Sequence, residues 1–263
     1  MKLNLINSPS SCELVSAWEK KTNSDSLNID WMNINTKSCP NSNCKKKIEK
    51  NQGCNHMTCN KNAGGCGYEF CWICLDKWSL HGTSFYKCNF FDEKKSKENN
   101  SKDKIENLLD TKKNLEKFNF YFDRYNIHSR SLDHFGKLKN QINLWTNLFL
   151  EKNFCDIDFL KQGYSVVIEG LRFLKNTYIV GFFLKLESNY ANLFLYNQNL
   201  LERNLDFLIE HLENEKKFRN IIDNDEFDSF NFEASKFRDE INDYSKATKK
   251  YISSLINEIK EKI

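Results

Sequence analysis

The stretch "CNKNAGGCGYEFCWIC", Cys59 to Cys74, holds four cysteines within sixteen residues and decides how this part of the chain can fold. Eight of the ten cysteines in the 263-residue chain lie between Cys39 and Cys88. The N-terminal sequence has no apolar run followed by a small-residue cleavage site, so we expect a soluble, intracellular protein without a secretory signal. In a reducing compartment, clustered cysteines favour metal binding over disulfides. The stretch therefore predicts a zinc-bound module.

Eight residues of this region can be grouped as pairs of metal ligands. A structural zinc site is tetrahedral and takes four sulfur or nitrogen ligands, which tight turns deliver two at a time. The pairs are Cys39 with Cys44, Cys59 with Cys66, Cys71 with Cys74, and His81 with Cys88. Eight ligands predict two Zn2+ ions. The segments "KKIEK", "HMTC" and "YEFC" between the turns are strand-like. Because a module of about fifty residues cannot be held by burial alone, we expect small antiparallel hairpins fixed by the metal.

Cys54 and His56 are left outside this grouping. Cys54 follows Gly53 in a polar loop, where it would be exposed. It could replace Cys59 as a metal ligand, or it could be an idle surface thiol. A solvated cysteine with a histidine two residues away is also the arrangement expected of a thiol nucleophile with a nearby base. The residue chemistry alone leaves these three interpretations open.

The second half of the chain is predicted to be helical. From residue 105 onward, apolar side chains recur at intervals of three, four and seven residues, as on the buried face of a helix. Breaks at Gly136 and within "EKNFCDID" and "DNDEFDSFN", together with many aromatic residues, favour a compact bundle over an extended coiled coil. Cys155 and His211 lie alone in this region, and we expect both to be structural.

The two halves are separated by residues 92–104, which contain no apolar residue and predict a solvated linker. Residues 1–36 form a lead-in that contains the amphipathic piece "CELVSAWEKK". The predicted fold class is therefore mixed: a small two-zinc β-hairpin module followed by an all-α helical bundle.

The segments "IEKNQGCNHMTC" and "GCGYEFCWICLDKWSLHGTSFYKCNFF" closely resemble the catalytic second RING of RING-between-RING ubiquitin ligases of the Ariadne subfamily. "IDWMNINTKSCP" before them and the helical tail after them match the same subfamily. The resemblance implies a remnant of the in-between-RING domain and a linker helix over residues 1–36, and a catalytic RING over 37–91. It further implies a linker over 92–104 and a helical Ariadne domain over 105–263.

The resemblance also implies a role for individual residues. The first zinc site would comprise Cys39, Cys44, Cys59 and Cys66, and the second Cys71, Cys74, His81 and Cys88. Cys54 matches the active-site cysteine that accepts ubiquitin from a conjugating enzyme as a thioester and passes it to a substrate lysine. His56 matches the general base that acts on this lysine, and Glu69 matches a supporting carboxylate. Trp72 and Trp78 are expected to cover the zinc-binding turns.

The chain departs from the family pattern in three places. The first turn, "CPNSNC", and the loop "NKNAGG" are both longer than usual. Upstream, "SPSSCELVSAWEKK" resembles only the end of the in-between-RING domain, and the first RING, which docks the conjugating enzyme in this family, is absent. We therefore expect a fragment, or a truncated relative that needs another protein to bring charged ubiquitin.

In this family the Ariadne domain folds back over the catalytic RING and inhibits it through a phenylalanine and two glutamates. The nearest positions in this chain are His134 or Phe135, Leu195 and Asp206. Only part of that contact is kept, so the sequence does not favour autoinhibition.

Composition restricts the class of function. A net charge of +3 from 39 basic and 36 acidic residues offers little attraction for phosphates, which argues against a nucleic-acid partner. The most apolar run, Tyr178 to Leu184, is far too short to span a bilayer. The expected partners are ubiquitin, a conjugating enzyme, protein substrates and a cullin-RING ligase, in the cytoplasm and also the nucleus. The alternative is a non-catalytic zinc-binding adaptor in a ubiquitin ligase complex, although an adaptor needs neither Cys54 nor His56.

Overall fold

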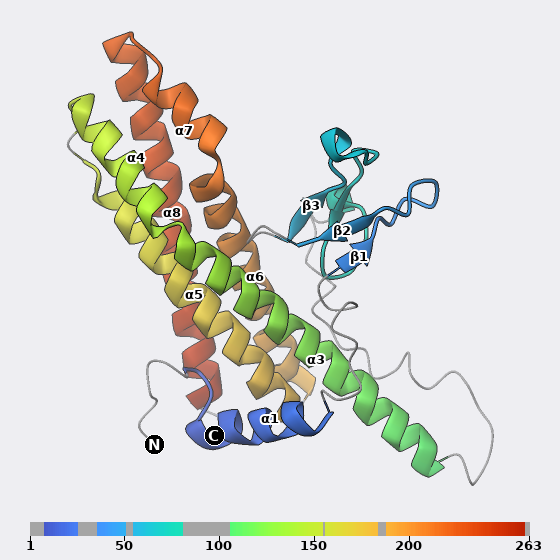
Figure 1. The fold of residues 1–263 in the computed structure, drawn as a ribbon. Helices are drawn as coiled ribbons and strands as arrows, with labels where there is room; N and C mark the ends of the chain where they lie inside the picture. Colours follow the sequence, from blue (N-terminus) through green and yellow to red (C-terminus); the bar gives the residue numbers. More distant parts are fainter. Residues whose placement is uncertain are drawn as a thin grey trace.

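A computed structural model describes residues 8–25, 36–50, 55–80, 106–154, 156–183 and 188–260. Figure 1 shows a small β module beside a long helical bundle, which confirms the predicted mixed fold class. The elements are, in chain order, α1 (Cys12–Asp25), β1 (Thr36–Ser38), β2 (Lys47–Glu49), β3 (His56–Thr58), the short 3-10 helix η2 (Lys61–Ala63), β4 (Glu69–Cys71), the 3-10 helix η3 (Trp78–Leu80), α3 (Glu106–Lys137), α4 (Lys139–Glu151), α5 (Asp158–Phe183), α6 (Ser188–Glu213), α7 (Glu215–Ile222) and α8 (Phe227–Lys260).

The cysteine-rich module consists of two antiparallel hairpins, β1–β2 and β3–β4. The strands predicted from "KKIEK", "HMTC" and "YEFC" correspond to β2, β3 and β4. In the second hairpin Met57 lies opposite Phe70. These two side chains and Trp72 form the small core of the module, and Ile127 of α3 completes it. The module therefore depends on the helical bundle for part of its own core.

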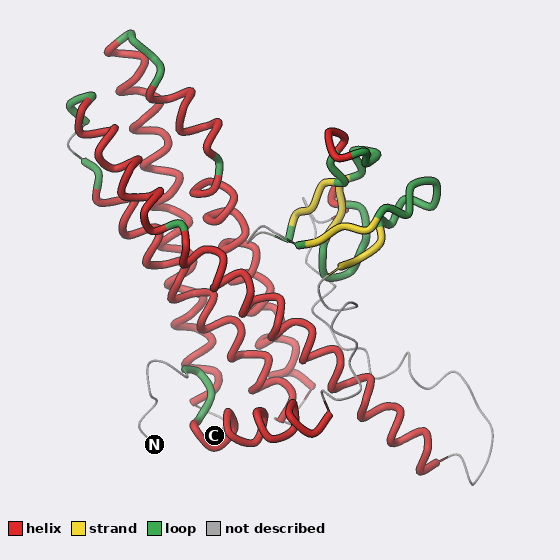
Figure 2. Tube along the Cα trace, viewed as in Figure 1, coloured by secondary structure: helices red, strands yellow, loops and turns green. Residues whose placement is uncertain are grey.

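The bundle is built around α5, which packs against α3, α6 and α8. Two glycines of α5 allow these helices to come close. A Cβ atom at Gly163 would lie 2.7 Å from Ile241 of α8, and one at Gly170 would lie 2.5 Å from Leu205 of α6. Figure 2 shows the long helices side by side, with short described connections between α3 and α4 and from α6 through α7 to α8, as expected of a bundle rather than a coiled coil.

The first break between helices falls at Leu138, two residues after the predicted break at Gly136. Helix α3 continues through Gly136 to Lys137, and the Leu138 N–H then donates to the Phe135 carbonyl at 3.1 Å. The predicted structural residue His211 lies in α6, where its ring Nδ1 is 2.8 Å from the Phe207 carbonyl. Cys155 and the predicted linker 92–104 lie outside the described residues.

The amphipathic piece near the N-terminus forms α1 and packs across one end of the bundle (Figure 1). The Ser11 hydroxyl accepts from the Leu14 N–H at 3.3 Å and caps the start of the helix. Trp18 is buried between Phe118 of α3 and Phe182 of α5, with ring centroids 5.6 and 5.4 Å away. This aromatic contact anchors the lead-in to the bundle. Within the described part of the chain, no helix has an apolar stretch long enough to cross a membrane.

Candidate metal centre and catalytic site

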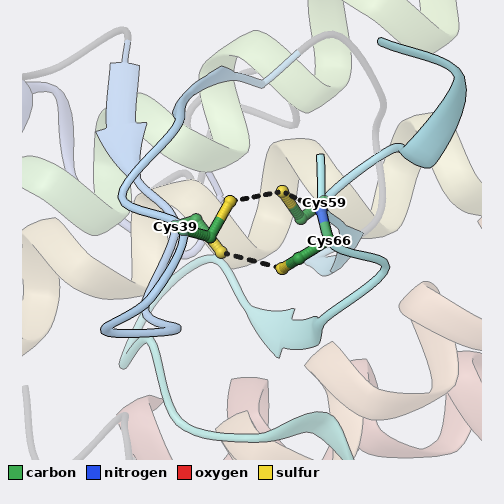
Figure 3. A group of neighbouring side chains, drawn as sticks. Cys39, Cys59 and Cys66 are labelled. Carbon is green, nitrogen blue, oxygen red and sulfur yellow. Dashed lines mark hydrogen bonds between the residues drawn. The ribbon is translucent and has the colours of Figure 1, made fainter. Parts of the chain in front are cut away.

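The four cysteines of the first predicted zinc site lie together in the structure. The sulfur atoms of Cys39, Cys44, Cys59 and Cys66 all lie within 4.8 Å of one another. Figure 3 shows three of them, Cys39, Cys59 and Cys66, with their sulfur atoms turned toward one another. The structure therefore groups these residues as the sequence predicted, even though both loops that carry them are longer than is usual in the family.

The spacing of the sulfur atoms fits a zinc ion. The Cys39 and Cys66 sulfurs are 3.7 Å apart, and the Cys44 and Cys59 sulfurs are 3.8 Å apart. A tetrahedron with zinc–sulfur bonds of about 2.3 Å has sulfur–sulfur edges of about 3.8 Å. Burial raises the pKa of the Cys39 thiol to about 12 and also raises the pKa of Cys59. Because a buried thiolate needs a nearby positive charge, this donor set calls for a cation.

Backbone hydrogen bonds hold the longer loops in place. The Cys59 N–H donates to the Tyr68 carbonyl at 2.9 Å, and the Gly67 N–H donates back to the Cys59 carbonyl at 2.7 Å. Gly64 ends η2 in the left-handed region, at φ 75°, which glycine adopts without strain. A Cβ atom at Gly65 would lie 2.6 Å from both the Asn60 carbonyl oxygen and the Cys59 sulfur. The two glycines of "NKNAGG" are therefore what lets this longer loop close around the cluster.

The second predicted zinc site is only partly described. Cys71 is buried at the end of β4, and Cys74 follows in a tight turn, closed by the Leu75 N–H, which donates to the Cys71 carbonyl at 2.9 Å. Leu75 itself is in the left-handed region, at φ 66°. His81 and Cys88 lie outside the described residues, so this ligand set stays a prediction.

His56 and Glu69 meet on one face of the second hairpin. His56 lies opposite Cys71, and Glu69 lies opposite Thr58, so the two side chains are diagonal neighbours across the strands. The His56 Nε2 atom is 3.3 Å from a carboxylate oxygen of Glu69. The side chains are 23% and 58% exposed, so this pair faces solvent, where an incoming group could reach it. Cys54 lies outside the described residues, two positions before His56.

Trp78 contacts His56, which the sequence did not predict. The indole ring lies parallel to the imidazole, with centroids 4.3 Å apart and an interplanar angle of 6°. The other tryptophan, Trp72, is fully buried in the core of the module. Trp78 was expected only to cover a zinc-binding turn, because sequence spacing does not show which side chain a loop residue will stack on.

Asn55, the residue after Cys54, is fixed by two acidic side chains of α6. Its backbone N–H donates to Asp206 at 3.3 Å, and its side-chain amide donates to Glu202 at 2.9 Å. All three residues are buried. Burial, and next the neighbouring Glu202, raise the pKa of Asp206 to about 8. The family resemblance matched Asp206 to one of the inhibitory glutamates of the family, but it did not identify Glu202.

The other positions that the sequence matched to the inhibitory residues of the family have different surroundings from Asp206. Phe135 is fully buried in the core of the bundle, and Leu195 packs against that core. The His134 ring lies 3.4 Å from the Glu213 carboxylate. Before residues 51–54 in the chain, the Lys50 ammonium donates to the Ser131 hydroxyl of α3 at 3.0 Å. The described residues on both sides of residues 51–54 are thus tied to the bundle.

The sequence of this chain is similar to those of known proteins. The family model described as "IBR domain" matches residues 34–85, which include the four-cysteine cluster, His56 and Glu69. The chain is 33% identical over 255 residues to "Probable E3 ubiquitin-protein ligase rbrA" of Dictyostelium discoideum, covering 95% of this chain and 46% of that protein. It is 38% identical over 218 residues to E3 ubiquitin-protein ligase ari-1.1 of Caenorhabditis elegans, covering 81% of this chain and 42% of that protein.

A third relative is E3 ubiquitin-protein ligase ariadne-1 of Drosophila melanogaster, at 34% identity over 217 residues, which cover 82% of this chain and 41% of that protein. The chain spans less than half the length of these curated relatives. The matches extend over both the cysteine-rich module and the helical bundle. The chain therefore belongs to the Ariadne group of RING-between-RING ubiquitin ligases, and its sequence is consistent with their C-terminal part.

Proposed function

We propose that this chain is a ubiquitin-transferring module that carries ubiquitin as a thioester on Cys54. The observation that supports this most strongly is the pair of His56 and Glu69, held together on the hairpin that directly follows Cys54. A histidine whose ring N–H donates a hydrogen bond to a carboxylate, and which faces solvent, is suited to accept a proton from an incoming amine at its other ring nitrogen. Family membership supports the same function.

Two acyl transfers make up the proposed reaction. In the first, the Cys54 thiolate attacks the thioester carbon that joins ubiquitin to the conjugating enzyme, and the thiolate of that enzyme leaves. In the second, the ammonium group of a substrate lysine loses a proton to His56 and the resulting amine attacks the Cys54 thioester. An amide bond forms as the nitrogen gives up a second proton, the bond between the carbonyl carbon and the Cys54 sulfur breaks, and the departing sulfur takes up that proton as a thiol. Glu69 supports His56 in the second step by accepting a hydrogen bond from one of its ring nitrogens.

Zinc has a structural role in this proposal. Bound zinc would fix the ends of the hairpins and, with them, the strand that carries His56. Cys39, Cys44, Cys59 and Cys66 would hold one ion, and Cys71, Cys74, His81 and Cys88 a second. The proposed partners are ubiquitin, a charged conjugating enzyme and protein substrates. A cullin-RING ligase stays a proposed partner on the basis of the family alone.

The test is intact-mass analysis after the chain is mixed with a charged conjugating enzyme, with and without a first-RING fragment of the family. We expect one ubiquitin adduct, which reductant removes, and faster loading when the first RING is supplied. Cys54→Ser should convert the adduct to an oxyester that withstands reductant, because the ester resists thiols. His56→Ala should load normally but discharge slowly to free lysine.

Two results would argue against these roles. Discharge by His56→Ala at the rate of the unmodified protein would remove the base assignment and leave Cys54 in place. If no Cys54-dependent adduct forms even with the first RING supplied, the non-catalytic adaptor becomes the better interpretation.

The contact of Asn55 with Glu202 and Asp206 supports a further proposal, that the helical domain restrains the catalytic module. This proposal differs from the expectation from the sequence, which named Leu195 and Asp206 as the nearest positions to the two glutamates of the family, whereas Glu202 supplies a second carboxylate that contacts Asn55. Glu202→Ala should release the Asn55 side chain and speed the loading of Cys54. An unchanged loading rate in this variant would mean that the contact does not restrain the module.

A further inference from the structure

The stacked contact between Trp78 and His56 is not accounted for by the residue roles above. Two contacts hold the His56 ring in the described part of the module: the hydrogen-bond distance of 3.3 Å to Glu69 and the parallel indole at 4.3 Å. A hydrogen bond at one ring atom fixes the position of that atom but leaves the ring free to rotate about the bond. A flat contact over the face of the ring fixes its plane.

The Glu69 contact is too exposed to hold the ring by itself. The Glu69 side chain is 58% exposed. An ion pair or hydrogen bond that is so accessible to water contributes little to holding the ring in one orientation. The Trp78 side chain is half-buried, and its stacked face excludes water from one side of the imidazole. Of these two contacts, the indole is therefore the one that can fix the orientation of His56.

The backbone after Cys71 explains how Trp78 reaches this position. The chain turns back after Cys74, and the Cys71 N–H donates to the Asp76 carbonyl at 2.9 Å. Phe70 then forms an isolated β-bridge with Lys77, directly before η3 begins at Trp78. The turn that carries two predicted ligands of the second zinc site thus sets the indole over a residue of the neighbouring strand.

We propose that Trp78 is a positioning residue for ubiquitin discharge, which acts through His56 by holding the plane of its imidazole. This inference rests on the proposed function, in which His56 accepts the proton of the attacking lysine. Loading of Cys54 by a conjugating enzyme does not use His56 in this scheme. Loss of the indole should therefore affect discharge and leave loading unchanged.

The experiment compares Trp78→Leu, which keeps apolar bulk without an aromatic face, with Trp78→Phe, which keeps a stacking ring. The zinc-loaded full chain is charged with ubiquitin on Cys54, and its discharge to free lysine is followed. Trp78→Leu should slow discharge by about tenfold, since a misplaced general base loses much of its effect. Trp78→Phe should restore most of the rate. Ser79→Ala, at the next and exposed position of η3, is the matched control and should behave as the unmodified protein.

A double-mutant cycle identifies the route of the effect. If Trp78 acts through His56, Trp78→Leu should cause no further loss of discharge in a His56→Ala background. An additional loss there would assign Trp78 another role. Nuclear magnetic resonance gives a second measure that does not depend on activity. The stacked indole shifts the His56 ring proton Hε1 upfield, and this shift should be lost in Trp78→Leu but kept in Ser79→Ala.

The outcomes separate this inference from the proposed function. Normal discharge by Trp78→Leu, or an unchanged His56 proton shift, would overturn the positioning role alone. Equal slowing of loading and discharge with loss of zinc would show that Trp78 only supports the fold. If the unmodified chain forms no adduct on Cys54, the proposed function fails and the positioning role fails with it.

Discussion

The cysteine-rich module and the helical bundle reach a defined structure by different means. Each strand of the module is three residues long, and its core consists of Met57, Phe70 and Trp72, with Ile127 contributed by the bundle. The bundle has helices of up to 34 residues around a continuous core of aromatic and aliphatic side chains. The difference teaches that one chain can rely on burial where it has long helices and on metal ligands where it has only short hairpins.

The proposed catalytic residues lie in the cysteine-rich module, which is the less buried of the two regions. The His56 and Glu69 pair faces solvent on a hairpin with little core of its own. The bundle reaches this hairpin at Asn55, through Glu202 and Asp206 of α6. The proposed site would have to admit both a conjugating enzyme and a substrate lysine, and this openness would favour it if metal and the neighbouring helices hold its parts.

Removal of the metal should show the largest difference in stability between the cysteine-rich module and the helical bundle. A strong zinc chelator should abolish the ordered signals of residues 36–50 and 55–80 and leave most of the helical circular dichroism, because structural zinc sites contribute about 10–16 kcal/mol to folding. Nuclear magnetic resonance spectra and circular dichroism, recorded on the same sample, provide the measurement. A module that stays ordered after the metal is removed would contradict the comparison.

The bundle should respond to loss of buried aromatic volume instead. Phe218 is fully buried and stacks on Trp145 with centroids 4.6 Å apart. Phe218→Ala should lower the free energy of unfolding by about 3–5 kcal/mol and leave the zinc content unchanged. Phe232→Ala, at a position 67% exposed on α8, is the control and should change stability by less than about 0.5 kcal/mol. Similar losses in the two variants would show that the core does not carry the stability of the bundle.

The contact between the two regions should depend on pH. Burial, and next Glu202, raise the pKa of Asp206 from about 3.8 to about 8, and Glu210 adds to the increase. Lys50 and the hydrogen bond from the Asn55 N–H oppose it. The carboxyl group is therefore protonated in the folded state over a range where it ionises once unfolded. Its stabilising effect is complete below pH 4 and is lost as the pH rises toward 8, by at most about 1.4 kcal/mol per pH unit.

Thermal unfolding between pH 4 and 8 measures this effect. Asp206→Asn keeps an acceptor for the Asn55 N–H but cannot ionise, so its melting temperature should fall less as the pH rises. The groups that face the same cluster, Lys50, Glu202, Glu210 and His128, remain in both proteins. Asp243→Asn, on the exposed face of α8, is the control. Parallel pH profiles for the unmodified protein and Asp206→Asn would contradict the assignment.

The smallest effect is expected at an exposed glycine of the bundle. A Cβ atom at Gly136, in the last turn of α3, would meet nothing within 4 Å. Gly136→Ala should therefore stabilise the protein by about 0.5–1 kcal/mol, since alanine loses less backbone entropy on folding. At Gly170 the added methyl would meet Leu205 at 2.5 Å, so Gly170→Ala should destabilise by about 1–3 kcal/mol. Denaturant unfolding of both variants should give opposite signs.

Much of the fold followed from patterns that are local in the sequence. The apolar spacing after residue 105 predicted the helices, and "KKIEK", "HMTC" and "YEFC" predicted three of the four strands. The pairing of Cys39, Cys44, Cys59 and Cys66 followed from the family resemblance and from zinc coordination, and the structure brings the four sulfurs together. These features depend on residue type and spacing, which a single sequence displays.

The remaining features depend on contacts between distant segments. Trp78 stacks on His56 because a turn folds η3 back over β3, and Glu202 meets Asn55 because α6 passes beside the module. No spacing in the sequence encodes either contact. The sequence did hold a clue to Glu202 itself, although not to its partner. Glu202 lies four residues before Asp206, and therefore on the same face of α6.

The most direct test of this account asks which cysteines hold metal and which one reacts. Zinc is counted by elemental analysis in the unmodified chain, in Cys59→Ser and in Cys54→Ser, each purified without added metal. We predict two zinc ions in the unmodified chain and in Cys54→Ser, and fewer in Cys59→Ser, whose module should lose its ordered structure. Equal loss of zinc from Cys54→Ser and Cys59→Ser would contradict the division of the cysteines into ligands and a nucleophile.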